Sequence, residues 1–144
     1  MKQLETNLDD MTPETLAYVQ EQLLAEGASD VWYIPIVMKK SRPAVTLCVL
    51  CEEEQSQALV DFILQETTSW GVREFTCERT VLPTQETEIF LYGESVRVKY
   101  AHVGNEYKCK PEYEDCARIA RVQNMPLRQV QAEAKMKGED RLAK

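Results

Sequence analysis

The order of strand-like and helix-like segments in the first 82 residues constrains the fold of this chain more than any other feature of its sequence. Hydrophobic residues recur at helical spacing in two segments, whereas four others are short runs rich in β-branched and aromatic residues. Strands are expected at residues 2–7, 30–38, 44–52 and 72–82, and helices at residues 13–26 and 53–67. This is the β-α-β-β-α-β order of a ferredoxin-like unit, which predicts an α+β fold with an antiparallel sheet and both helices on one face.

Single residues indicate where these elements begin and end. Thr12 can cap the first helix, Pro13 suits its first position, and Gly27 ends it. Pro35 has no backbone N–H to donate, so its strand is expected at an edge or in an irregular part of the sheet. Near the end of the chain, Gly138 is expected to begin a frayed segment.

The pattern changes after a connector at residues 83–86. Strands are expected at residues 87–92, 95–103 and 106–110, with turns at Gly93-Glu94 and Gly104-Asn105. Two helices should then begin at Pro111 and Pro126. We therefore predict a ferredoxin-like unit at residues 1–82 and a β-hairpin ribbon with two C-terminal helices at residues 83–144, packed as one domain.

Composition limits the partners and the compartment of the protein. The chain has 24 acidic and 17 basic residues, a net charge of −7, which argues against nucleic acid as a partner because backbone phosphates require clustered positive charge. No apolar run approaches the ~20 residues of a membrane span, and no signal peptide is recognisable, so we expect a cytoplasmic protein without membrane contact. Five cysteines are an odd number, which suits a reducing compartment.

Cys48 and Cys51 have the spacing of a metal-binding pair. They lie in a segment that is expected to be a strand, where side chains three residues apart point to opposite faces. The two sulfurs therefore cannot hold one ion, and we interpret both residues as small buried hydrophobic side chains.

Four oxygen-bearing side chains stand just before the first helix. Glu5, Asn7, Asp9 and Asp10 fall within six residues, and the first three share one face if the strand continues. Carboxylate and amide oxygens suit hard cations such as Mg²⁺ or Mn²⁺. The alternative is that Asp10 only caps the helix and the other side chains are solvated.

Basic residues are concentrated in the loop at residues 39–43. Lys39, Lys40 and Arg42 place three cations within four residues, and such side chains bind phosphate oxygens well. The alternative is a hairpin tip that only keeps the surface soluble.

A second concentration of positive charge is expected on the hairpin ribbon. A turn at Gly104-Asn105 would place Lys99 opposite Lys110, with Arg97 and Lys108 on the same face. Like charges directly opposite each other are destabilising, so this pair requires an explanation. Either Glu88 on the neighbouring strand neutralises Lys99, or the face binds a polyanion.

The sequence contains no motif for nucleophilic catalysis, and we name no catalytic residue. His102 is the only histidine and is interpreted as structural. The five glycines are scattered and form no phosphate-binding loop, so side chains would have to hold any nucleotide.

Seven ungapped stretches carry a family resemblance over nearly the whole chain. They are residues 4–14 (LETNLDDMTPE), 33–43 (YIPIVMKKSRP), 66–73 (ETTSWGVR), 78–83 (ERTVLP), 92–101 (YGESVRVKYA), 110–116 (KPEYEDC) and 126–130 (PLRQV). Together they resemble the C-terminal, CTP-binding portion of the LarC family, the nickel-insertion proteins of nickel-pincer cofactor biosynthesis.

The resemblance implies a chemistry that the residue pattern does not show. Such proteins insert nickel into pyridinium-3,5-bisthiocarboxylic acid mononucleotide and are classed as nickel chelatase-type lyases. Their reaction depends on CTP and on Mg or Mn, and it cleaves CTP to CMP and pyrophosphate. The product is the cofactor of lactate racemase. The family's larger N-terminal portion, with its histidine-rich nickel-storing region, is not in this sequence. We therefore expect the chain to bind CTP and metal but to require that portion to insert nickel.

The resemblance also assigns roles to the charged residues. The implied nucleotide-binding residues are Lys39, Lys40, Arg42, Arg73, Arg97, Lys99 and Lys110. The implied metal ligands are Asp9, Asp10 and Glu5. We expect the cations to converge on one triphosphate. The alternative is a ferredoxin-like module that binds a small anion, or mediates oligomerisation, without catalysis. Exposed sheet edges further predict a homo-oligomer.

Overall fold

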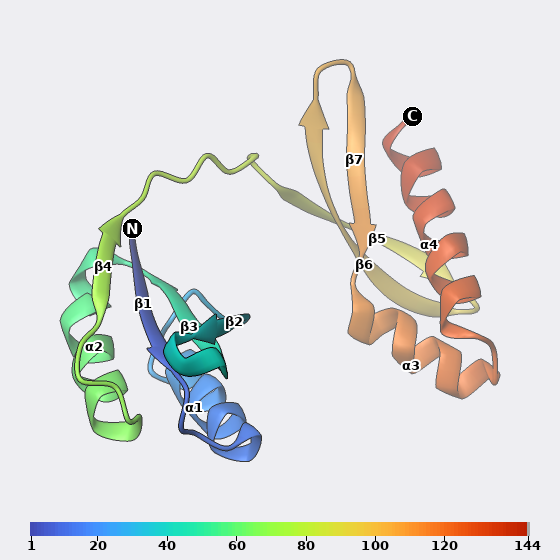
Figure 1. The fold of residues 1–144 in the computed structure, drawn as a ribbon. Coiled ribbons are helices and arrows are strands. Elements are labelled where there is room, and N and C mark those ends of the chain that lie inside the picture. The colour runs from blue at the N-terminus through green and yellow to red at the C-terminus, as the bar shows by residue number, and fades with distance from the viewer. Residues whose placement is uncertain (144) are drawn as a thin grey trace. The chain divides into compact units, whose positions relative to one another are not determined.

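The computed structural model describes residues 1–143, and the chain divides into two compact units, Met1–Arg79 and Thr80–Lys144 (Figure 1). Each unit has its own hydrophobic core. Within the described residues, no helix is both long and apolar enough to cross a membrane.

The first unit is a four-stranded antiparallel sheet with two helices. Its elements are β1 (Lys2–Leu8), α1 (Pro13–Ala25), β2 (Asp30–Met38), the 3₁₀ turn η1 (Lys39–Ser41), β3 (Arg42–Cys51), the 3₁₀ turn η2 (Glu53–Gln55), α2 (Ser56–Glu66) and β4 (Arg73–Thr76). The strand order β2-β3-β1-β4 and the antiparallel pairing are those of a ferredoxin-like unit. The predicted α+β fold class is therefore confirmed.

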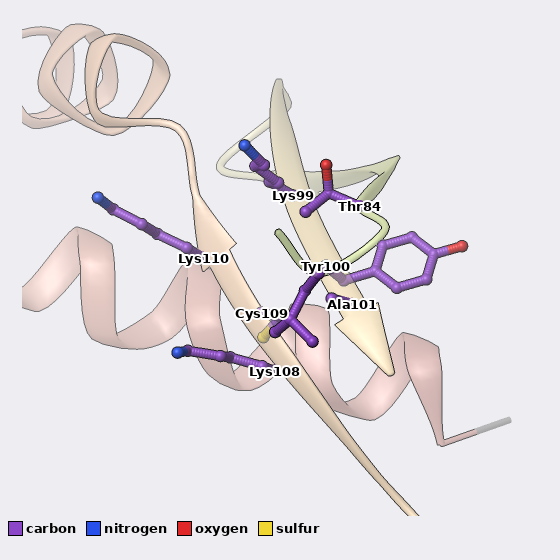
Figure 2. Close-up of a pocket in the computed structure, with 8 residues that line it drawn as sticks. Thr84, Lys99, Tyr100, Ala101, Lys108, Cys109 and Lys110 are labelled. Atoms are coloured by element: carbon purple, nitrogen blue, oxygen red, sulfur yellow. The ribbon is translucent and has the colours of Figure 1, made fainter. Parts of the chain in front are cut away.

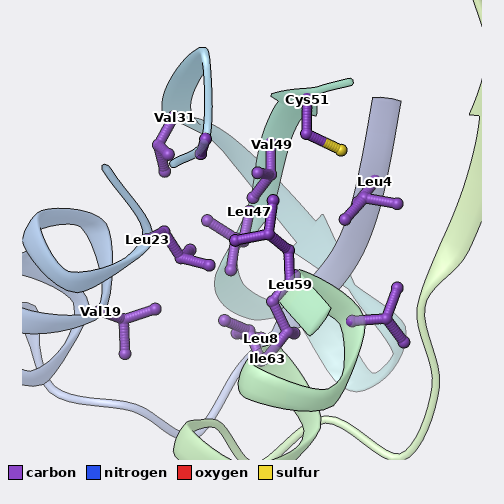
Figure 3. Packing of buried hydrophobic residues seen from close by; sticks show 12 residues of the cluster. Leu4, Leu8, Val19, Leu23, Val31, Leu47, Val49, Cys51, Leu59 and Ile63 are labelled. Atoms are coloured by element: carbon purple, nitrogen blue, oxygen red, sulfur yellow. The ribbon is translucent and has the colours of Figure 1, made fainter. Parts of the chain in front are cut away.

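Both helices of the first unit pack on one face of the sheet. Leu4 of β1, Leu47 of β3, Leu23 of α1 and Ile63 of α2 are fully buried in a single cluster (Figure 3). Burial of this apolar surface stabilises the fold, at roughly 25 cal/mol per Å². The cluster includes Cys51 but not Cys48, so the two thiols lie on opposite faces, as the strand geometry predicted.

The local signals at the first helix and at Pro35 are confirmed. The side chain of Thr12 accepts a hydrogen bond from the backbone N of Thr15, and Pro13 opens α1. Gly27 follows the helix at a φ of 99°, a left-handed conformation that favours glycine. The strand that contains Pro35, β2, lies at the edge of the sheet.

The predicted fourth strand is too long. Strand β4 covers only Arg73–Thr76, not residues 72–82. It pairs with β1, and the last pair of that ladder joins Lys2 to Thr76. Beyond this point the segment has almost no backbone partner, so its β-branched composition does not produce a strand.

The second unit is a three-stranded antiparallel sheet with two helices. Its elements are β5 (Gln85–Leu91), β6 (Glu94–Val103), β7 (Glu106–Pro111), α3 (Tyr113–Gln123) and α4 (Leu127–Leu142), and the strands lie in chain order. Val96 and Val98 of β6 form a buried core with Ile119 of α3 and Val130 of α4.

The expectation of a frayed segment from Gly138 to Lys144 is wrong for the described residues, because α4 continues to Leu142, and Lys144 lies outside them. Gly138 is buried, and a Cβ atom at this position would lie 3.1 Å from Cγ1 of Val98 and 3.7 Å from Sγ of Cys109. The missing side chain therefore allows the helix to approach the sheet closely.

The first hairpin turn lies one residue earlier than predicted. Tyr92 and Gly93 occupy the turn with φ values of 52° and 79°, the geometry of the two-residue turns that suit twisted hairpins. Glu88 therefore pairs with Arg97 and not with Lys99, so the predicted neutralisation of Lys99 by Glu88 is wrong. The second turn is confirmed and places Lys99 opposite Lys110.

Candidate functional site

The first candidate site is a cavity of about 390 Å³ in the first unit. We call it the β1-end cavity, and it is lined by Thr6, Asn7, Asp9, Asp10, Met38, Lys39, Arg42, Thr68, Ser69, Trp70, Gly71 and Arg73. The loop after β1 contributes the carboxylates, and the β2–β3 connection and the start of β4 contribute the cations. Five of the ten residues that the sequence nominated therefore meet in one cavity: Asp9, Asp10, Lys39, Arg42 and Arg73.

Basic side chains of the β1-end cavity contact acidic and amide side chains. Nη1 of Arg42 lies 3.2 Å from Oδ2 of Asp9 in an exposed ion pair. Nη2 of Arg73 donates to Oδ1 of Asn7 at 2.9 Å and to Oε2 of Glu5 at 3.3 Å. Each guanidinium therefore has a polar partner, yet remains about half exposed and open to a ligand.

The nominated metal ligands do not form a complete cation site by themselves. Asp9 and Asp10 line the cavity, and Asp10 accepts a hydrogen bond of 2.5 Å from Oγ1 of Thr68. Glu5 does not line it, because Gln3 and Arg73 hold its carboxylate. Across residues 1–143, no three His, Cys, Asp or Glu side chains are placed to hold one ion. A Mg²⁺-like cation at Asp9 or Asp10 would need oxygens from a ligand and from water to complete its coordination.

Sequence reasoning missed the loop between α2 and β4 as a part of this cavity. Oγ of Ser69 lies 2.5 Å from Oγ1 of Thr6 and donates to the carbonyl of Gly71 at 2.8 Å. Between these two anchored positions, the indole of Trp70 is fully exposed at the cavity, with a relative exposure of 101%. The only signal in the sequence was the run of hydroxyl residues before Trp70.

The second candidate site lies in the second unit. This ribbon cavity has a volume of about 280 Å³ and is lined by Leu82, Thr84, Lys99, Tyr100, Ala101, Lys108, Cys109 and Lys110. Figure 2 shows that the chains of Lys108 and Lys110 leave β7 on the same side, whereas the phenol of Tyr100 points away from them. Lys99 and Lys110 thus line a cavity of the second unit, and the nominated residues Lys39, Arg42 and Arg73 line the cavity of the first unit.

Two other nominated cations line neither cavity. Lys40 adopts a left-handed backbone conformation, with a φ of 62°, in the turn after β2. Arg97 is held by Asp115 at the start of α3, with its Nε 2.9 Å from Oδ2 and its Nη2 3.3 Å from Oδ1. The hydrogen bonds from Arg97 lower the pKa of Asp115 to about 2, and the same carboxylate raises the pKa of Arg97. These contacts join β6 to the start of α3.

Comparison with known proteins identifies the family. The model of the nickel insertion protein family matches residues 1–131. The pyridinium-3,5-bisthiocarboxylic acid mononucleotide nickel insertion protein of Acetivibrio thermocellus is 45% identical over 127 residues, which are 88% of this chain and 31% of that protein. The protein of the same name in Clostridium acetobutylicum is 43% identical over 128 residues, 88% of this chain and 30% of that protein. The chain belongs to the nickel insertion protein family, and it spans about a third of the length of these relatives.

Solved structures agree with this assignment. A structure described as LarC2, the C-terminal domain of a cyclometallase involved in synthesis of the NPN cofactor of lactate racemase, is 42% identical, with a TM-score of 0.90 over 94% of each chain. A protein of Methanopyrus kandleri is 27% identical, with a TM-score of 0.68 over 94% of this chain and 84% of that one. The resemblance to the LarC C-terminal portion is thus confirmed.

Proposed function

We propose that this chain is the CTP- and divalent-metal-binding part of an enzyme that inserts nickel into pyridinium-3,5-bisthiocarboxylic acid mononucleotide. One observation carries the proposal: cations and carboxylates from three separate segments line the β1-end cavity. A nucleoside triphosphate and its metal ion need both kinds of group at once. Family membership supports this choice of ligand over other phosphate compounds.

Binding is expected to exchange one set of ion pairs for another. The pair between Arg42 and Asp9 is exposed, and such pairs contribute only about 0–1 kcal/mol, so separating it costs little. Arg42 would then face phosphate oxygens with its planar fork, beside Lys39, while Asp9 turns to the metal ion. The exposed indole of Trp70 offers a surface on which the cytosine ring can stack.

The donor set of this cavity suits a hard cation better than nickel. Asp9 and Asp10 offer carboxylate oxygens, which fit Mg²⁺ or Mn²⁺, whereas a softer metal prefers imidazole and thiolate ligands. A bound Mg²⁺ or Mn²⁺ would neutralise charge that develops as CTP is cleaved to CMP and pyrophosphate. The arginines would hold the phosphates in line and stabilise the same charge.

The activity of the whole protein extends this proposal. Since the relatives are about three times as long as the chain, we place nickel insertion in the full-length, cytoplasmic enzyme, which includes the N-terminal portion. The product would serve lactate racemase, and the full protein would be a homo-oligomer. Packing of the two units as one CTP-binding domain also remains a prediction, as does the role of Lys40 and Arg97 in nucleotide binding.

Calorimetric titration of CTP in the presence of Mn²⁺ tests the proposal. We expect Arg42→Ala to weaken CTP binding at least tenfold, because a charged hydrogen bond is worth about 1.5–3 kcal/mol and 1.4 kcal/mol is tenfold in affinity. Arg128→Ala, at an exposed position on α4, is the matched control and should bind like the parent chain. Unchanged affinity in Arg42→Ala would remove this cavity from the nucleotide site.

The same titration separates the proposal from the small-anion alternative. A CTP- and metal-binding domain should bind CTP more tightly than ATP or GTP and should lose affinity when Mn²⁺ is chelated. A general anion effector should bind all three nucleotides alike, and an oligomerisation module should bind none of them.

A further inference from the structure

Three lysines of the ribbon cavity make no ion pair within the described part of the chain, although Glu86 of β5 stands opposite Lys99. Among residues 1–143, no carboxylate lies within 4.0 Å of the ammonium groups of Lys99, Lys108 or Lys110 in an ion pair, whereas Arg97 and Arg118 are both paired with Asp115. Lys99 and Lys110 also stand directly opposite each other on paired strands. Like charges in this arrangement destabilise a sheet, and a bound anion would reduce that repulsion.

The floor of the ribbon cavity is apolar. Ala101 is 5% exposed and lies on the same face of β6 as Lys99, opposite Lys108 of β7, and Leu82 reaches the cavity from the segment before β5. The methylene chains of the lysines add further apolar surface around it. Figure 2 shows Ala101 and the three lysines among the lining residues, with the ammonium groups extending away from the strands. The cavity therefore combines an apolar surface with positive charge at its rim.

The ribbon cavity differs from the β1-end cavity in one chemical respect. Within the described part of the chain, no Asp or Glu lines it, whereas Asp9 and Asp10 line the β1-end cavity. A metal-bound triphosphate needs carboxylate or water ligands for its ion, which the ribbon cavity does not offer. Its lysines suit an anion that arrives without a metal ion, and its volume of about 280 Å³ suits one aromatic ring with its substituents.

We propose that the ribbon cavity is a second ligand site, which binds an aromatic mononucleotide with acidic ring substituents. The ring would lie on Leu82 and Ala101, and the acidic groups would meet the three lysines. The pyridinium bisthiocarboxylate mononucleotide in the names of the relatives belongs to this class. The inference rests on the proposed function only in assigning CTP to the other cavity.

Titration with nicotinic acid mononucleotide tests this site without metal or CTP. The probe carries a pyridinium ring, a carboxylate and a phosphate. We expect it to bind the parent chain, and the double variant K99Q/K110Q to bind it at least tenfold more weakly, because glutamine keeps much of the chain but removes the charge. Lys137→Gln changes a lysine of α4 that lines another cavity and donates to the carbonyl of Phe90, and it should bind like the parent chain.

A crossed titration separates this inference from the proposed CTP site. K99Q/K110Q should keep its affinity for CTP with Mn²⁺, and Arg42→Ala should keep its affinity for the probe. Absence of probe binding at millimolar concentration, or equal binding by K99Q/K110Q, would overturn the second site. Loss of CTP affinity in K99Q/K110Q would also overturn it, because the lysines would then belong to the triphosphate site. If Arg42→Ala leaves CTP affinity unchanged, the proposed CTP site fails, while the probe result still decides the second site.

Discussion

Replacing Asp115 by Asn is expected to destabilise the second unit by about 1–2 kcal/mol at neutral pH. The carboxylate accepts hydrogen bonds from the backbone N of Arg97 at 3.0 Å and from its Nε at 2.9 Å, and Arg118 lies 3.5 Å away. The pKa of Asp115 falls from its ordinary 3.8 to about 2, and each pKa unit corresponds to about 1.36 kcal/mol. The lowered pKa corresponds to a stabilisation of roughly 2 kcal/mol. Both arginines are about half exposed, so solvent screening reduces this contribution to about 1–2 kcal/mol.

The difference in stability between the parent chain and the Asp115→Asn variant is expected to depend on pH. Because folding lowers the pKa of Asp115, its contribution is complete above pH 3.8 and is lost as the pH falls toward 2. Urea unfolding followed by far-UV circular dichroism should therefore show a gap between parent and variant at pH 7 that closes near pH 2. Both tryptophans, Trp32 and Trp70, lie in the first unit, so tryptophan emission reports that unit and serves as the control. Equal stabilities at pH 7, or a gap that persists at pH 2, would refute the reasoning.

Three further outcomes are expected. In a Trp32→Phe background, CTP with Mn²⁺ should quench the emission of Trp70 whereas inorganic tripolyphosphate should not; equal quenching by both would argue against base stacking. Leu59→Ala should lower the free energy of unfolding of the first unit by about 2–5 kcal/mol in urea titrations, because Leu59 is 1% exposed; a loss below 1 kcal/mol would contradict the packing. The phenol of Tyr33 donates to the carbonyl of Leu16 and should ionise near pH 12 in an absorbance titration, because burial raises its pKa to about 12. Since folding raises this pKa above its ordinary value of 10, the free energy of unfolding should fall as the pH rises above 10.

The fold class was readable from the sequence because its signals are local. The alternation of helical and strand spacing, the cap at Thr12 and the break at Gly27 each act over a few residues. Pro35 likewise excluded an interior strand through the missing N–H alone. The predicted ends of elements were wrong where a contact with a residue far away in the sequence determines whether the strand or helix continues. The end of β4 depends on its ladder with β1, and Gly138 remains helical because it packs against Val98.

The candidate sites were only partly readable, because charge density does not show which side chains meet. Local spacing nominated Arg42, Asp9 and Lys99, and only the tertiary structure showed that Arg42 and Asp9 line one cavity of the first unit while Lys99 lines a cavity of the second unit. A turn displaced by one residue moved Glu88 from Lys99 to Arg97, since every pair along a hairpin follows from its turn.

The sequence by itself determined the order of the elements, the family and the types of charged group available for binding. Only the tertiary structure decided which of these groups face a common cavity, placed Trp70 beside Asp9, and turned Arg97 toward Asp115. The physical reason is that backbone conformation responds to neighbouring residues, whereas a binding cavity is formed by segments that are far apart in the chain and adjacent only after the sheet and its helices have packed.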